Sequence, residues 1–227
     1  SRGVLLISDP MTTWEVNGIG MLLGRGGDGS VTMSGGAHLL FANSDGEGLV
    51  ISQKAGSTGK LAASDAGTLI DAREGKVTLG ELAGSDGTLA LSNGAQLLAA
   101  QEVTIGDAGS GGVTARSGAQ IIVSGGDQTH FAIGNEVGSS GGISVEGTGS
   151  LLSVDALWTI GVKGTGFAGV GGGAHVQSNG VELGFRPGSS GTIVVAGAGS
   201  RWSDSIFALV GGNPDIPPTG TGALHVQ

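Results

Sequence analysis

Histidines and serines are the residues of this sequence that could perform acid–base or nucleophilic chemistry. His38 and His175 each follow a Gly-Ala pair, and Gln96 and Gln120 occupy the same place in other copies of that pattern. A general base acts within one positioned group of side chains, whereas these two histidines recur with a repeat. We therefore interpret His38 and His175 as corner residues that face solvent.

The other histidines and the serines lack the partners that catalysis requires. His130 and His225 are isolated in the sequence, and His225 aligns with Ala90 on the polar side of a predicted strand. A serine nucleophile needs a base beside it, but the serines recur in Gly-Ser and Gly-Ser-Ser-Gly turns. The serines interpreted as turn residues are Ser139, Ser140, Ser189 and Ser190.

Two short segments resemble parts of calcium-binding repeats. They are Gly26-Gly-Asp-Gly29 and Gly125-Gly-Asp127. Such repeats bind calcium only in tandem, where aspartates of successive turns share one ion, and here each segment stands alone. A polysaccharide lyase would need clustered carboxylates and a base, whereas lysine occurs only at 54, 60, 76 and 163. We therefore predict no catalytic residue, metal or cofactor, and no enzyme activity, and the sequence assigns no binding residue.

A glycine-led pattern of alternating apolar residues recurs along the chain and must position whatever site exists. Its lead glycines lie 24 to 31 residues apart, at Gly29, Gly59, Gly87, Gly111, Gly141, Gly166, Gly191 and Gly222. Each unit also contains a short strand ending in glycine, such as Val103-Thr-Ile-Gly106. Three short strands per unit are typical of one turn of a parallel β-helix. We predict an all-β solenoid of about eight to nine coils, forming a single domain over residues 1–227.

Alternation within the strands predicts which side chains face the core. Leu89 and Leu91 lie on one face, and Thr88 and Ala90 lie on the other. A glycine recurs at the corner that follows, where a positive φ or a close approach of backbones favours it. Trp14 and Trp202 align with the apolar residues after that corner. The prediction is that both are core residues.

Composition excludes several classes of protein. Glycine supplies 49 of 227 residues without a three-residue period and with 5 prolines, which argues against collagen. Cysteine is absent, so disulfides and thiolate metal sites are excluded. The net charge of -9 repels phosphate, so we expect no nucleic-acid partner. No apolar run is long enough for a membrane helix, and we expect no direct membrane insertion.

Two segments depart from the short loops of the other units. They are Gly184-Phe-Arg-Pro-Gly188 and Gly212-Asn-Pro-Asp-Ile-Pro-Pro-Thr-Gly220. Loops that leave a solenoid can carry binding residues, and they can also be tolerated insertions, which we favour. In the first segment, Phe185 and Arg186 are the expected exposed pair of an aromatic residue and a cation.

The repeats resemble the glycine-rich repeats of bacterial autotransporter passenger domains. The residues that carry this resemblance are Ile133-Gly134 through Gly149-Ser150, Ile160-Gly161 through Val176, and Leu183-Gly184 through Trp202. The resemblance covers nearly the whole chain, with a looser fit at residues 46–71 and 213–218. It implies a right-handed parallel β-helix and type V secretion to the bacterial surface. Outer-membrane anchoring would come from a C-terminal β-barrel, and neither that barrel nor a signal peptide is in this sequence.

From this resemblance we expect a surface-exposed passenger segment that acts in adhesion or self-association. An extended solenoid face would attach to a host or bacterial surface protein or glycan, or to like passengers, as in biofilms, host-cell attachment and virulence. Two alternatives remain open. The segment is a stalk that presents a catalytic or effector domain located outside it, or it is a purely structural component of the envelope.

Overall fold

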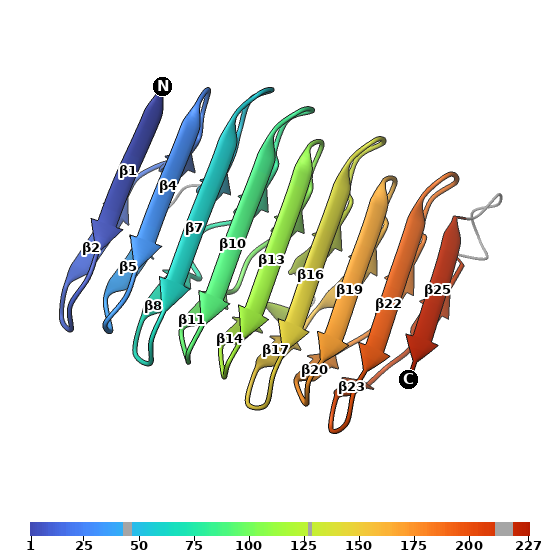
Figure 1. Cartoon of the computed structure of the whole chain (residues 1–227). Helices are drawn as coiled ribbons and strands as arrows, with labels where there is room; N and C mark the ends of the chain where they lie inside the picture. Colours follow the sequence, from blue (N-terminus) through green and yellow to red (C-terminus); the bar gives the residue numbers. More distant parts are fainter. Residues whose placement is uncertain (43–46, 127–128, 212–219) are drawn as a thin grey trace.

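The chain winds into a β-solenoid in which every strand pairs with parallel neighbours (Figure 1). The computed structural model describes residues 1–42, 47–126, 129–211 and 220–227. Strands of successive coils lie side by side, and the two termini lie at opposite ends of the stack (Figure 1). The prediction of an all-β parallel helix of eight to nine coils is confirmed by one sheet of nine strands and two of eight.

Each coil contributes one strand to each of three sheets, which we call sheets A, B and C. Sheet A contains β1 (Arg2–Ile7), β4 (Asp28–Met33), β7 (Thr58–Ser64), β10 (Asp86–Ser92), β13 (Ser110–Arg116), β16 (Ser140–Glu146), β19 (Thr165–Gly171), β22 (Ser190–Ala196) and β25 (Thr221–Val226). Sheet B contains β2 (Thr13–Asn17), β5 (His38–Ala42), β8 (Leu69–Ala72), β11 (Gln96–Ala99), β14 (Gln120–Val123), β17 (Leu151–Val154), β20 (His175–Ser178) and β23 (Arg201–Asp204). Sheet C contains β3 (Gly20–Leu23), β6 (Gly48–Ile51), β9 (Val77–Leu79), β12 (Val103–Ile105), β15 (His130–Ile133), β18 (Leu157–Ile160), β21 (Val181–Leu183) and β24 (Ala208–Val210).

The lead glycines form one unbroken column across sheet A. The sequence pattern missed its first member, Gly3, which pairs with Gly29, and the pairing continues coil by coil to Gly222. A Cβ at Gly141 would lie 2.0 Å from the carbonyl oxygen of Ile105 and 2.9 Å from the amide nitrogen of Gly134. The lead glycine therefore recurs because the backbone at the corner between sheets C and A passes directly against it.

The corner between sheets A and B uses glycine for a different reason. The predicted positive φ is confirmed there, at values of 79° to 85° for Gly36, Gly67, Gly94, Gly118, Gly149, Gly173 and Gly199. Residues with a Cβ rarely adopt this conformation, so glycine allows each coil to turn without steric cost.

Ser52 explains why residues 46–71 fit the sequence pattern loosely although the described part of this segment, residues 47–71, forms a regular coil. Its position follows β6 and corresponds to the glycine that ends the equivalent strand of other coils, such as Gly80. Ser52 keeps the positive φ of 67°, and its Oγ donates to the carbonyl oxygen of Ser57 at 2.9 Å. The same hydroxyl accepts from the amide of Asp86 at 3.0 Å. These hydrogen bonds stabilise a serine where the other coils use glycine.

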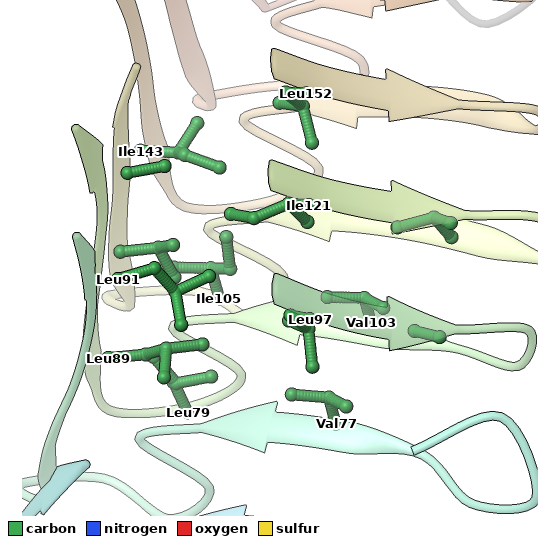
Figure 2. Packing of buried hydrophobic residues seen from close by; sticks show 14 of the residues in the cluster. Val77, Leu79, Leu89, Leu91, Leu97, Val103, Ile105, Ile121, Ile143 and Leu152 are labelled. Carbon is green, nitrogen blue, oxygen red and sulfur yellow. The ribbon is translucent and has the colours of Figure 1, made fainter. Parts of the chain in front are cut away.

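Aliphatic side chains from the three sheets fill the inside of the solenoid (Figure 2). Leu89 and Leu91 of β10 are 2% and 0% exposed, while Thr88 and Ala90 lie on the outer face, as alternation predicts. Figure 2 shows Leu79, Leu97 and other labelled side chains converging between the strands of successive coils. Each coil therefore buries its apolar residues against the coils above and below it.

The prediction that both Trp14 and Trp202 are core residues is wrong for Trp14. The register does place Trp14 beside Leu39 and Trp202 beside Val176, in the inward column of sheet B. Trp14 belongs to β2, the first strand of its sheet, so only one neighbouring strand covers it and it is 45% exposed. Trp202 belongs to the last strand of that sheet and is half-buried against the core.

Candidate binding surface

The histidines singled out from the sequence lie on the outside of the solenoid. His38, Gln96, Gln120 and His175 occupy one outward column of sheet B, so the interpretation as a repeat position is confirmed. Gln96 Nε2 donates to Gln120 Oε1 at 3.1 Å across neighbouring coils. His175 is exposed and His38 is half-buried. His225 is also exposed, and the register places it in the column of Ala90.

His130, which the sequence left without a partner, has polar neighbours on the outer face of sheet C. Its Nε2 lies 3.3 Å from Thr159 Oγ1 on the next coil. Burial lowers the pKa of His130, although the charge of Glu102 opposes this effect. Glu102 itself forms an ion pair with Lys76 at 2.8 Å. These contacts connect successive coils, which is a structural role for the histidine.

The prediction that the serines singled out from the sequence are turn residues is confirmed for Ser139 and Ser189 and wrong for Ser140 and Ser190, which begin β16 and β22. Ser139 Oγ donates to the carbonyl oxygen of Glu136 at 2.7 Å, and Ser189 Oγ donates to that of Arg186 at 2.7 Å. Ser140 Oγ donates to Ser110 Oγ of the neighbouring coil at 3.3 Å, and Ser190 pairs with Thr165 in sheet A. These contacts close turns or join coils, and none involves a histidine.

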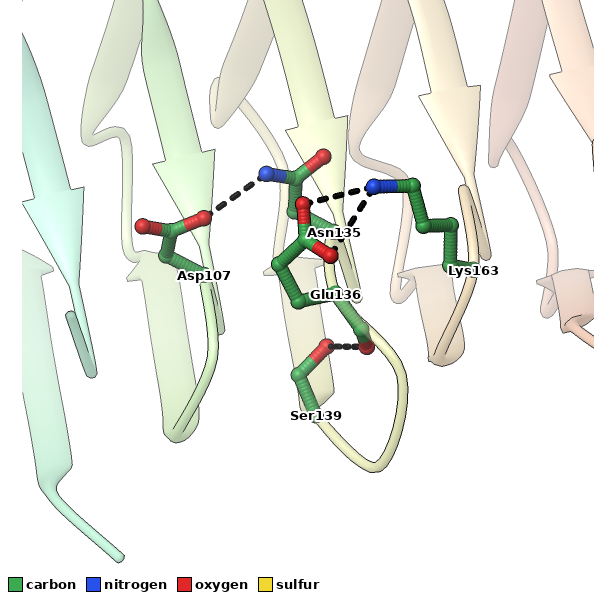
Figure 3. Close-up of polar contacts among 5 residues, drawn as sticks. All are labelled: Asp107, Asn135, Glu136, Ser139 and Lys163. Carbon is green, nitrogen blue, oxygen red and sulfur yellow. Dashed lines mark hydrogen bonds and ion pairs between the residues drawn. The ribbon is translucent and has the colours of Figure 1, made fainter. Parts of the chain in front are cut away.

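The loops that follow sheet C are joined from coil to coil by polar side chains (Figure 3). Asn135 Nδ2 donates to Asp107 Oδ1 at 2.7 Å, and Lys163 Nζ donates to both carboxylate oxygens of Glu136 at 2.7 and 2.9 Å. Each contact in Figure 3 joins a residue to its own turn or to an adjacent coil. Because the pair of Lys163 and Glu136 is exposed on both sides, it contributes little to stability.

The segments that depart from the regular loops lie partly outside the described residues. Phe185 and Arg186, expected to be exposed, are half-buried, and the guanidinium carbon of Arg186 lies 4.7 Å from the centre of the Phe185 ring. Each of the two side chains therefore covers part of the other. Residues 212–219 of the second segment, and Asp127 of one calcium-like segment, lie outside the described residues. The aspartate of the other, Asp28, accepts from Thr58 Oγ1 at 2.6 Å.

A group of polar side chains lies on the outer face of sheet B, near the C-terminal end. There, β17, β20 and β23 form the floor of an open depression of about 550 Å³. Its outward side chains are Ser153, Asp155, His175, Gln177, Asn179, Arg201, Ser203 and Ser205. We call this region the polar depression. Open depressions lined with polar groups suit shallow, reversible binding.

Some side chains of the polar depression are held in place by their neighbours. Asp204 Oδ2 accepts from Ser178 Oγ at 2.6 Å and from the amide of Gly180 at 3.1 Å, so its carboxylate is committed to the scaffold. Asn179 donates to Asp155 and accepts from Ser205, which joins three coils along one column. This edge of the polar depression is therefore rigid.

The other side of the polar depression presents groups that are free to bind. Among the described residues, Ser153, His175 and Gln177 have no side-chain hydrogen-bond partner, and Arg201 uses only its Nε, which donates to Ser203 Oγ at 2.8 Å. The two terminal nitrogens of Arg201 remain available. No ion pair involves Arg201 within the described part of the chain. The arrangement can therefore offer several donors to one ligand.

No binding residue was predicted from the sequence, and the polar depression was not foreseen. The sequence does contain an indication of it, because the middle outward position of the sheet B strands becomes consistently polar in the later coils. The position alternates between charged and apolar residues in earlier coils, at Glu15, Leu40, Asp71, Leu98 and Ile122, and it holds only uncharged polar residues in later ones, at Ser153, Gln177 and Ser203. Finding that change requires the register of the strands, which the irregular lengths of the units obscure.

Glu182, in β21, is a buried carboxylate, and we expect its negative charge to weaken the fold at neutral pH. Its side chain is 8% exposed, and burial raises its pKa, with the charge of Arg186 opposing the shift. A raised pKa in the folded state means that stability falls as pH rises from the ordinary value of 4.5 through the folded value. We expect Glu182→Gln to stabilise the protein near neutral pH and to lose that advantage near pH 4.

Urea unfolding at both pH values tests this effect. Glu146→Gln is the matched control, because Glu146 is exposed at the end of β16 and should respond little. A Glu182→Gln variant that is less stable than the parent near neutral pH would contradict the assignment of burial as the main influence.

Among the described residues, none forms a helix long and apolar enough to cross a membrane. Within the same residues, no group of three or more histidine, aspartate or glutamate side chains is arranged to hold a metal ion. In comparisons with known proteins, no family model, no curated protein and no solved structure matches this chain.

Proposed function

We propose that this chain is an adhesive segment of a secreted bacterial surface protein of the autotransporter-passenger type, acting through the outer faces of its solenoid. The observation that carries the proposal is the polar depression, where free donors lie on strands held rigidly by parallel pairing. A shallow site makes modest contacts, and a surface that displays many copies adds them through avidity. Adhesion to a host or bacterial surface glycan or protein fits this arrangement.

Self-association is a second mode of the same function, and sheet A favours it. Its outer face carries small side chains that allow two flat surfaces to approach closely. They are Ser30, Thr32, Ala62, Thr88, Ala90, Thr114 and Ser144, and the larger exposed side chains of Lys60 and Phe167 interrupt the same face. Sedimentation velocity over a range of protein concentrations separates this mode from attachment to foreign surfaces, because only self-association changes the sedimentation coefficient of the purified chain.

Retention of cells on a surface coated with the purified chain tests the adhesive function. We expect the parent chain to retain bacterial or host cells above an inert protein coat, and Gln177→Ala with Arg201→Ala to reduce retention several-fold through lost avidity. Arg25→Ala is the control, because Arg25 is exposed in the loop that follows β3, away from both the polar depression and the outer face of sheet A. Unchanged retention by the double variant would exclude the polar depression as the adhesive surface. Retention by the parent chain no higher than that of the inert coat would favour the alternative of a stalk or structural component.

A further inference from the structure

The side chains of the polar depression form a regular lattice of known spacing. Neighbouring strands lie about 4.8 Å apart, and outward residues two positions apart on one strand are separated by about 6.6 Å. His175 pairs directly with Arg201, and Gln177 pairs with Ser203. Along each strand the column of His175 and Arg201 lies about 13 Å from the column that holds Asp155 and Asn179. The polar depression can therefore contact one extended ligand at several points.

The two ends of this lattice differ in charge. Arg201 carries a permanent positive charge, is exposed, and has no carboxylate partner among the described residues. The nearest acid along its own strand is Asp204, whose carboxylate accepts from Ser178, Gly180 and Ile206. In a chain of net charge -9, an unpaired guanidinium beside a histidine is a local site for an anionic group. A carboxylate suits it, because the guanidinium fork can donate two parallel hydrogen bonds.

The rest of the polar depression favours a ligand rich in hydroxyl groups. Ser153 and Gln177 have free side chains that can both donate and accept, and Asp155 keeps acceptor capacity beyond its bond from Asn179. Every outward side chain that lines the polar depression is polar, so nothing there would hold an apolar side chain of a peptide. β17 and β20 are paired on both sides, so a peptide strand could be added only at β23, the last strand of sheet B.

We propose that the polar depression binds an acidic saccharide, with a sugar carboxylate at Arg201 and His175 and sugar hydroxyls at Gln177, Ser153 and Asp155. This inference rests on the proposed adhesive function and specifies the chemistry of its ligand. The carboxylate fixes the orientation of the saccharide, and the hydroxyl contacts extend along the strands towards Asp155. Affinity at one site is weak, as expected for an open surface, and display of many copies strengthens attachment.

Binding of oligogalacturonate to the purified chain, measured by calorimetry or NMR titration, tests the inference. We expect the free acid to bind, its fully methyl-esterified form to bind at least about tenfold more weakly, and Arg201→Ala to cause a similar loss. Arg201→Lys should recover part of the affinity by restoring the charge. Arg116→Ala is the matched control, because Arg116 is an exposed arginine of sheet A outside the polar depression. Thermal unfolding of each variant confirms that it is folded.

Three results would overturn the inference. Equal binding of the acid and its ester would exclude carboxylate recognition, and equal binding of polyglutamate would exclude a preference for saccharide. Unchanged affinity of both Arg201→Ala and Gln177→Ala would place the ligand elsewhere. Failure here is distinguishable from failure of the adhesive function: cell retention that oligogalacturonate does not compete would leave adhesion intact and remove only the acidic saccharide.

Discussion

Gly141→Ala is expected to lower the free energy of unfolding by about 3 kcal/mol or more, whereas Gly142→Ala leaves it unchanged or raises it by up to about 1 kcal/mol. The two glycines are neighbours in β16, yet their surroundings differ. A Cβ at Gly141 would lie 2.0 Å from the carbonyl oxygen of Ile105, and one at Gly142 would meet nothing within 4 Å. Neither glycine has a positive φ, so the difference isolates the steric contact.

Urea unfolding of both variants, followed by circular dichroism, measures this difference. The clash involves backbone on the corner of another coil, which cannot move aside as a flexible side chain could. Relief therefore requires neighbouring coils to separate, and strand pairing is lost on both sides of β16. Similar midpoints for the two variants would show that the column of lead glycines is not set by close approach of the backbone.

The same column shows how much of the fold the sequence could predict. Recurrence of Gly59, Gly87 and Gly111 before alternating apolar residues was sufficient to predict a β-solenoid and the inward positions of Leu89 and Leu91. Gly3 was missed because its unit begins at the start of the chain and has no preceding copy to align with. Ser52 was missed because its hydroxyl makes hydrogen bonds that compensate for a conformation usually left to glycine.

The two tryptophans of sheet B show that alternation of apolar residues does not by itself predict burial. Alternation correctly assigned Trp14 and Trp202 to the inward column, but burial also depends on whether another coil covers that position. Trp14 is 45% exposed because it lies on the first strand of sheet B, while Ile70, in the middle of the same column, is 0% exposed. The polar depression was not predicted for a similar reason. Its side chains come from three coils, and they are brought together only by the register of the strands.

Trp158→Ala should lower the free energy of unfolding by about 3 to 5 kcal/mol, the usual range for truncation of a buried aromatic residue. Trp158 is 0% exposed, in the middle of sheet C. Its ring meets the edge of Phe131 at 4.9 Å between ring centres and stacks on Trp202 at 4.7 Å. Truncation therefore leaves a cavity and removes both aromatic contacts.

Trp158→Phe separates this packing from the polar part of the indole. Nε1 of Trp158 is buried without a hydrogen-bond partner, so its removal relieves an unsatisfied donor while the ring remains. We expect a smaller loss than for alanine, of about 1 to 2 kcal/mol, because part of the volume is kept. Equal losses in urea unfolding of the two variants would contradict this account.

Replacement of Trp158 should also weaken ligand binding at the polar depression, because Trp202 stacks on Trp158 and belongs to the strand that carries Arg201. Nε1 of Trp202 donates to Ser178 Oγ at 2.9 Å, and Ser178 donates to Asp204 at 2.6 Å. Trp202 lies between Arg201 and Ser203 on β23, so the ring that rests on Trp158 holds the strand that presents both residues. Trp158→Ala should therefore weaken binding at the polar depression more than an equally destabilising change in an early coil, such as Leu61→Ala in β7.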